Sequence, residues 1–142
     1  LFGASLSDKN NDFFKKVLSL SKLDEVIQSL PDGLDTIISD SNPILSGGQK
    51  QCLGFARAFF KNRDILVLDE ATNAMDRQLE IDLMDNISSL EFKMIIAITH
   101  KSSFLEYFHR TCVLENGIIQ DYDLTSNLIN KNKFLIKMLN KN

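Results

Sequence analysis

The chain has 142 residues, of which 44% are hydrophobic and 25% charged, a composition typical of a globular domain with a buried core. Its formal net charge of -3 provides no overall electrostatic attraction to nucleic acid or to an anionic membrane surface. The longest apolar run, from Met94 to Ile98, is far shorter than the roughly 18 residues that cross a bilayer. The composition therefore argues against a basic nucleic-acid-binding protein and against a transmembrane helix in this sequence.

The cysteines and the first residue bear on where the protein works. Neither Cys52 nor Cys112 has a second Cys nearby, and the one His close to Cys112, His109, is a single potential ligand, which argues against a metal–thiolate role. No signal peptide precedes the predicted fold, so we expect reduced thiols. Because the sequence starts with Leu1 rather than Met, we expect it to be a piece of a longer protein.

The first third of the chain is predicted to be helical. Apolar side chains recur at helical spacing over residues 8–30, which predicts one or two amphipathic helices that stop at residues 31–33, Pro-Asp-Gly. A further helical pattern covers residues 46–60. Leu53, Ala56 and Phe60 are predicted to lie on one face of this helix.

After residue 61 the pattern alternates between strands and helices. Continuous apolar runs at residues 65–68 and 94–98 are typical of strands that are buried on both faces. Helices are predicted over residues 77–90 and 102–108. This alternation predicts an α/β fold.

A hairpin and a helix are predicted for the C-terminal segment. Residues 111–114 form a third predicted strand, and Asn116-Gly117 is a strong signal for a two-residue hairpin turn. Residues 124–139 are predicted to form one final helix.

Leu45-Ser46-Gly47-Gly48-Gln49 stands directly before a predicted helix. Ser46 and Gln49 have the spacing of a capping box, which is a purely structural interpretation. Glycine costs about 1 kcal/mol relative to alanine within a helix, so the glycine pair indicates a close approach to the backbone. A helix N-terminus also suits a phosphate, and both interpretations remain open.

Polar residues follow both predicted parallel strands. Asp69 and Glu70 stand at the end of the first strand, where ligands of open α/β sheets bind. Such a pair of carboxylates suits Mg²⁺ with a nucleotide. The alternative is that the two residues belong to a solvated loop. His100 follows the second strand and is predicted at the same sheet edge. Asp76, after Asn73, is either a functional residue or the cap of the next helix.

Taken together, these motifs resemble the nucleotide-binding domain of an ATP-binding cassette transporter of the exporter branch. Residues 45–49 are similar to the signature motif of that family, and residues 65–70 to its Walker B strand with the catalytic glutamate. Residues 73–76 look like its D-loop, His100 like its switch histidine, and residues 30–36 like an exporter segment.

The resemblance implies a partial P-loop NTPase, or RecA-like, domain. Residues 1–61 would form a helical subdomain that ends in the signature-motif helix. Residues 62–142 would form the C-terminal part of the ATPase core. In this family two such domains close head to tail around ATP and Mg²⁺, and a transmembrane domain is attached. The implied location is the cytoplasmic face of a membrane, with no nucleic-acid partner.

The resemblance also implies a role for each motif. The residues that would bind ATP held by the second domain are Leu45, Ser46, Gly47, Gly48 and Gln49. Asp76 would bridge the dimer interface and so belongs with these ATP-binding residues. Asp69 would hold Mg²⁺. Glu70 would polarise the attacking water, and His100 would contact the γ-phosphate; both are the expected catalytic residues.

Three features differ from the family pattern. The sequence contains no G-x-x-x-x-G-K-[ST] motif, so we expect the chain alone to hold ATP poorly and to be inactive. The segment at residues 39–42 and the presence of Cys52 are also unusual for an exporter.

Two alternatives belong to other functional classes. An SMC-type chromosome or repair ATPase carries these motifs on a separate C-terminal lobe, but this chain lacks heptad-patterned arms and a basic cluster. A non-catalytic interaction module is disfavoured by the intact Glu70 and His100.

Overall fold

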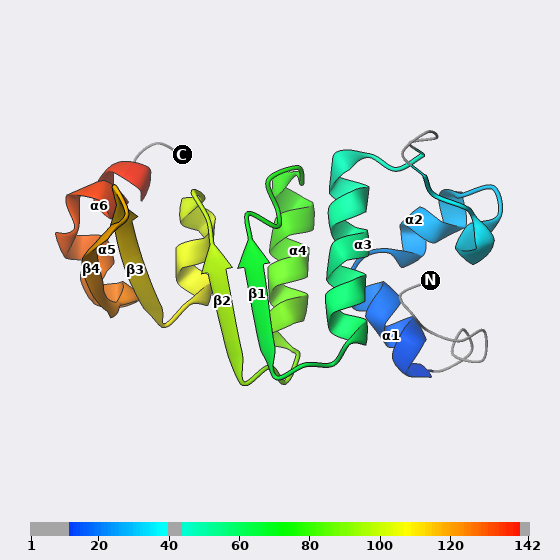
Figure 1. Ribbon diagram of the computed structural model, residues 1–142, viewed down its shortest axis with the longest axis horizontal. Helices are drawn as coiled ribbons and strands as arrows, with labels where there is room; N and C mark the ends of the chain where they lie inside the picture. Colours follow the sequence, from blue (N-terminus) through cyan, green and yellow to red (C-terminus); the bar gives the residue numbers. More distant parts are fainter. Residues whose placement is uncertain (1–11, 40–43, 140–142) are drawn as a thin grey trace. The chain divides into compact units, whose positions relative to one another are not determined.

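The computed structural model describes residues 12–39 and 44–139, which divide into two compact units between Ala97 and Ile98. The first unit contains α1 (Asp12–Leu20), α2 (Asp24–Ser29), the 3-10 helix η2 (Gly33–Asp35), α3 (Gly47–Phe60), β1 (Ile65–Asp69), α4 (Arg77–Ser88) and most of β2 (Met94–Ile98) (Figure 1). The second unit contains the 3-10 helix η3 (Ser102–Tyr107), β3 (Arg110–Glu115), β4 (Ile118–Leu124), α5 (Thr125–Lys131) and α6 (Lys133–Leu139). This order of helices and strands confirms the predicted α/β class. The predicted subdomain boundary after residue 61 remains a prediction.

The first helical segment consists of α1 and α2, so the prediction of one or two helices resolves into two. The turn between them includes Lys22 with a φ of 56°. The buried Ser21 hydroxyl donates to the Val17 carbonyl at 2.8 Å and so satisfies the end of α1. Residues 8–11 of the prediction lie outside the described residues.

Helix α3 forms at the predicted place but buries a different face. Its buried side chains are Cys52, Phe55, Ala56 and Phe59. This set repeats at intervals of three and four residues, as one helix face requires. Of the three residues predicted to share a face, Ala56 is buried, whereas Leu53 and Phe60 are only partly buried. The Phe60 ring instead meets the edge of Phe14 in α1 at a centroid distance of 5.9 Å.

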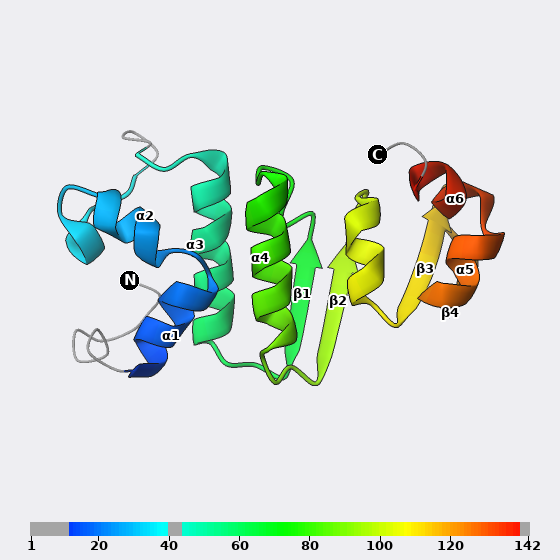
Figure 2. The ribbon, with the colours of Figure 1, turned by 180° about the vertical axis from the view of Figure 1, so that it is seen from behind.

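β1 and β2 form a two-stranded sheet, and Figures 1 and 2 show that they run side by side in the same direction. The prediction that both strands are buried on both faces was wrong. Leu66 and Leu68 are each 4% exposed, but the opposite face of the sheet carries large exposed apolar side chains. These are Ile65 (53% exposed), Val67 (59%), Met94 (53%) and Ile96 (46%). A parallel sheet normally has cover on both faces, and the described residues of this unit cover one.

The second unit is an antiparallel hairpin packed against helices. β3 pairs with β4, with an irregularity between Val113 and Leu114. Asn116 and Gly117 have φ values of 51° and 76°, which confirms the predicted turn because such turns need positive φ.

The C-terminal segment forms α5 and α6, so the prediction of one continuous helix was wrong. The helices are interrupted at Asn132, whose side-chain oxygen accepts from the amides of Phe134 and Leu135 at 3.0 and 3.1 Å. An asparagine that caps a new helix competes with continuation of the previous one. In the residues that the structure describes, no helix is long and apolar enough to cross a membrane.

Candidate functional site

Ser46 caps the N-terminus of α3. Its side-chain oxygen accepts from the Gln49 amide at 3.2 Å, and the Gln49 side-chain oxygen accepts from the Ser46 amide at 2.9 Å. This reciprocal pair confirms the capping box. The preceding Leu45 is 6% exposed and anchors the segment in the core of this unit. Burial of Leu45 and the capping box therefore fix residues 45–49 at the helix start.

The glycine pair at this helix start faces another part of the same chain. A Cβ added to Gly47 would lie 3.0 Å from the Ala74 Cβ, and one added to Gly48 would lie 3.1 Å from the Ala74 carbonyl oxygen. Both distances are shorter than ordinary van der Waals contacts. The close approach that the sequence indicates is thus made by the loop after β1, whereas a phosphate at this helix start remains a prediction.

Gln51 links α3 to the same loop. Its side-chain oxygen accepts a hydrogen bond from the Ala74 backbone amide at 3.1 Å. Gln51 did not stand out in the sequence, because a glutamine within an amphipathic helix has no distinctive pattern. Its position four residues after Gly47, on the same side of the helix, is the one available signal.

The end of β1 presents the two predicted carboxylates. Asp69 is the last residue of the strand, Glu70 follows it, and both side chains are exposed. Glu70 has a φ of 47°, in the left-handed region that non-glycine residues seldom adopt. The Asn73 side-chain amide donates to the Glu70 carboxylate at 2.7 Å. The backbone turn and this hydrogen bond together fix the direction of the carboxylate.

Asp76 caps α4. Its carboxylate accepts from the Leu79 amide at 3.0 Å, which confirms the structural interpretation of this residue. The Asp76 charge also contributes to a raised pKa of the buried Cys52 thiol, although the main cause is burial of that thiol. The role of Asp76 at a dimer interface remains a prediction.

His100 belongs to the second compact unit and follows the end of β2 by two residues in the chain. The structure therefore brings the N-terminus of α3, Asp69, Glu70 and Asp76 together in one unit. The prediction that His100 shares their sheet edge stays a prediction.

A pocket of about 380 Å³ lies between α3 and β1 next to these residues. Its lining includes Lys50 and Gln51 from the helix, and Asp69 and Glu70 from the end of the strand. The described residues contain no cluster of three or more metal-binding side chains. Mg²⁺ is commonly held by one or two carboxylates together with substrate phosphates, so the donor set fits a magnesium ion that arrives with a nucleotide.

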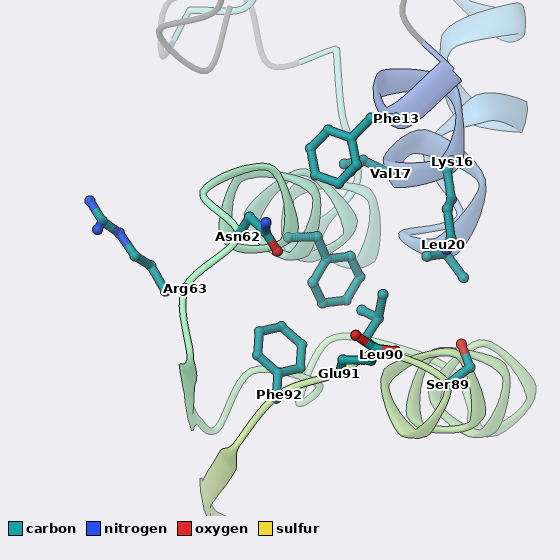
Figure 3. Close-up of a pocket in the computed structure, with 11 residues that line it drawn as sticks. Phe13, Lys16, Val17, Leu20, Asn62, Arg63, Ser89, Leu90, Glu91 and Phe92 are labelled. Atoms are coloured by element: carbon teal, nitrogen blue, oxygen red, sulfur yellow. The ribbon is translucent and has the colours of Figure 1, made fainter.

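A second pocket, of about 300 Å³, lies at the other end of α3 (Figure 3). Phe13, Leu90 and Phe92 contribute apolar walls, whereas the Arg63 side chain points away from them. Because α3 has 14 residues, this pocket is about 20 Å from Ser46. It is therefore not part of the candidate site.

Comparisons with known proteins agree on one family. A family model described as ABC transporter matches residues 6–73. The ATP-dependent lipid A-core flippase of Cupriavidus metallidurans is 39% identical over 119 residues, which cover 83% of this chain and 20% of the flippase. The mating factor M secretion protein mam1 of Schizosaccharomyces pombe is 34% identical over 134 residues, which cover 94% of this chain and 10% of that protein.

The fold comparison gives a consistent result. A solved structure of a bacterial Atm1-family ABC exporter with ATP bound matches this chain with a TM-score of 0.84 at 26% sequence identity. The match covers 98% of this chain and 24% of the exporter chain.

Proposed function

We propose that this chain, which belongs to the ABC transporter family, supplies the C-terminal part of an ATP-hydrolysing domain that drives export of a substrate across a membrane. The fold class is the one expected from the sequence, a partial P-loop NTPase fold. The chain spans 20% of the flippase and 24% of the exporter chain that it matches. The activity, substrate and partners of a longer protein are therefore part of the proposal.

The observation that supports the proposal is the fixed arrangement of three motifs in one unit. The capped start of α3 contacts the loop that connects Glu70 to Asp76, through Gln51 and the glycine pair. A phosphate-binding helix start and an acidic strand end are the parts that phosphoryl transfer needs for positioning and charge stabilisation. Neither the helix start nor the acidic strand end by itself would distinguish a phosphoryl-transfer site from a purely structural cap or a solvated loop.

We assign the roles as follows. Leu45, Ser46, Gly47, Gly48 and Gln49 form the surface that meets the γ-phosphate of ATP held by the P-loop of a second domain. Asp69 holds Mg²⁺ together with the nucleotide phosphates, and Glu70 accepts a proton from the attacking water. His100 contacts the γ-phosphate, and Asp76 combines its helix cap with a contact across the dimer.

The proposed partners are a second nucleotide-binding domain and a transmembrane domain at the cytoplasmic face of a membrane. The P-loop is the missing component, because the sequence contains no G-x-x-x-x-G-K-[ST] motif. Its amides and lysine would cradle the β- and γ-phosphates. We therefore propose that the chain alone neither binds ATP tightly nor hydrolyses it.

Isothermal titration with Mg-ATP tests this proposal. The measurement compares this chain with a longer protein in which a P-loop precedes it. We expect binding by the longer protein and no measurable binding by the chain alone. Tight binding by the chain alone would contradict the assignment of the phosphate site, and no binding by either protein would contradict the proposed function.

A further inference from the structure

The loop after β1 carries residues that the proposed reaction needs at both of its ends. Glu70 starts this loop and Asp76 ends it as the cap of α4. Such a loop must be fixed if the Glu70 carboxylate is to act on one defined water, because small displacements of a catalytic group slow a reaction strongly. Side chains from α3 and from within the loop hold it in place.

The first support comes from α3. Gln51 accepts from the Ala74 amide at 3.1 Å, and Ala74 is also the residue against which Gly47 and Gly48 lie. Ala74 is thus held by a hydrogen bond and by close contact with the helix start. Among the atoms that a Cβ at Gly47 or Gly48 would meet, those of Ala74 include the nearest, at 3.0 and 3.1 Å.

The second support comes from within the loop. Asn73, the neighbour of Ala74, donates its side-chain amide to the Glu70 carboxylate at 2.7 Å. The Asn73 backbone amide also donates to the Glu70 carbonyl at 3.2 Å, which closes the turn in which Glu70 has a φ of 47°. Fixing Ala74 therefore restricts Asn73, and Asn73 restricts both the backbone and the carboxylate of Glu70.

We propose that Gln51 and Asn73 are positioning residues that couple the start of α3 to the carboxylate of Glu70. This inference rests on the proposed function, in which the start of α3 meets ATP and Glu70 activates water. When a ligand displaces Ser46 and the glycine pair, this displacement is then transmitted through Ala74 to the Glu70 carboxylate. Neither residue touches the reacting atoms in this scheme.

Gln51→Met and Gln51→Glu form a matched pair of variants. Methionine has a similar length but no strong acceptor, whereas glutamate keeps an oxygen for the Ala74 amide. Gln28→Met is the control, because Gln28 is an exposed glutamine in α2 of the same unit. Asn73→Ala removes the carboxylate contact and leaves the Gln51 bond intact, so it tests the second link even where Gln51→Met does not fold.

The first measurement uses this chain without nucleotide. NMR gives the hydrogen-exchange rate of the Ala74 amide and the chemical shifts of the Asn73 side-chain amide protons. In Gln51→Met we expect exchange about fivefold faster and a shift of the Asn73 signals, because one neutral hydrogen bond is lost. Gln51→Glu and Gln28→Met should resemble the wild type. Unchanged Asn73 signals in Gln51→Met would overturn the coupling.

The second measurement uses the longer, P-loop-containing protein. Gln51→Met and Asn73→Ala should lower kcat about tenfold with an unchanged KM for ATP, and Gln51→Glu should restore most of kcat. An increase in KM with an unchanged kcat would overturn the positioning role. A wild-type protein without ATPase activity would contradict the proposed function, while the exchange measurement would still decide the coupling.

Discussion

Gly47 and Gly48 have the same neighbour, Ala74, and this contact explains why two glycines stand in the first turn of α3. A glycine pair there weakens the helix, so its presence requires a compensating contact. The compensation is the packing of the loop after β1 against the bare backbone. The same contact keeps the helix start and the acidic residues in one rigid arrangement.

Alanine substitutions separate this contact from ordinary helix propensity. Gly48→Ala should destabilise the protein by about 1–3 kcal/mol, because the new Cβ would lie 3.1 Å from the Ala74 carbonyl oxygen. Gly54→Ala is the matched control in the same helix, where a Cβ meets nothing within 4 Å. It should stabilise the protein by about 1 kcal/mol. Urea unfolding gives the change in the free energy of unfolding for each variant. Equal changes in Gly48→Ala and Gly54→Ala would contradict the proposed contact between Gly48 and Ala74.

Helices α1 and α4 of the first unit are joined by polar contacts near the turn after α1. Lys22 and Asp82 form an ion pair at 2.8 Å, and the Asn86 side chain donates to the Leu20 carbonyl at 2.9 Å. The hydrogen bond from Lys22, helped by one from Gln78, lowers the pKa of Asp82. The hydrogen bond to Asp82 in turn raises the pKa of Lys22.

These shifts predict how stability depends on pH. Because the pKa of Asp82 is lower in the folded state, its contribution is present above the unfolded value of about 3.9 and is lost as the pH falls through the folded value. Asp82→Asn should therefore reduce the free energy of unfolding at pH 7 and have no effect at an acidic pH at which the carboxylate is protonated in both states. Urea unfolding at both pH values checks this. A difference that persists at low pH would indicate a packing effect instead.

At the level of elements, local patterns predicted most of the fold. The capping box at Ser46, the apolar runs of β1 and β2, and the turn at Asn116-Gly117 are determined by neighbouring residues, and the structure confirms them. The predicted single C-terminal helix failed because Asn132 caps a new helix, a choice that periodicity does not record. The buried face of α3 depends on tertiary packing, which apolar spacing alone does not determine.

In the candidate site, too, some features could be predicted from local sequence and others arise only from tertiary contacts. Asp69, Glu70 and the residues before α3 were predictable because their positions at the ends of elements have chemical meaning. Gln51 was not, because its partner Ala74 is 23 residues away and the contact exists only in the folded unit. The hydrogen bond between Asn73 and Glu70 depends on the positive φ of Glu70, which the sequence does not indicate.

At the scale of the whole molecule, one prominent surface feature of the described residues is the uncovered face of the β1–β2 sheet. Ile65, Val67, Met94 and Ile96 are each about half exposed, as expected for a core that lacks part of its cover. Contiguous apolar surface of this kind promotes association.

We therefore expect this chain to self-associate through that face. Replacing Ile65, Val67 and Ile96 together by threonine should weaken association at least about tenfold, the effect of losing about 60 Å² of apolar contact at about 25 cal/mol per Å². Ile37→Thr is the control, because Ile37 is 83% exposed but lies outside the sheet. Sedimentation velocity over a range of concentrations measures the self-association of each variant. A wild-type chain that stays monomeric would contradict the expected association.

The most direct test of the central claim is ATP hydrolysis by the longer, P-loop-containing protein in its wild-type and Glu70→Gln forms. Glutamine keeps the size of the side chain and an acceptor for Asn73 but cannot take a proton from water. We predict that hydrolysis falls at least about a hundredfold while Mg-ATP binding is retained. An unchanged rate of hydrolysis in Glu70→Gln would contradict the account.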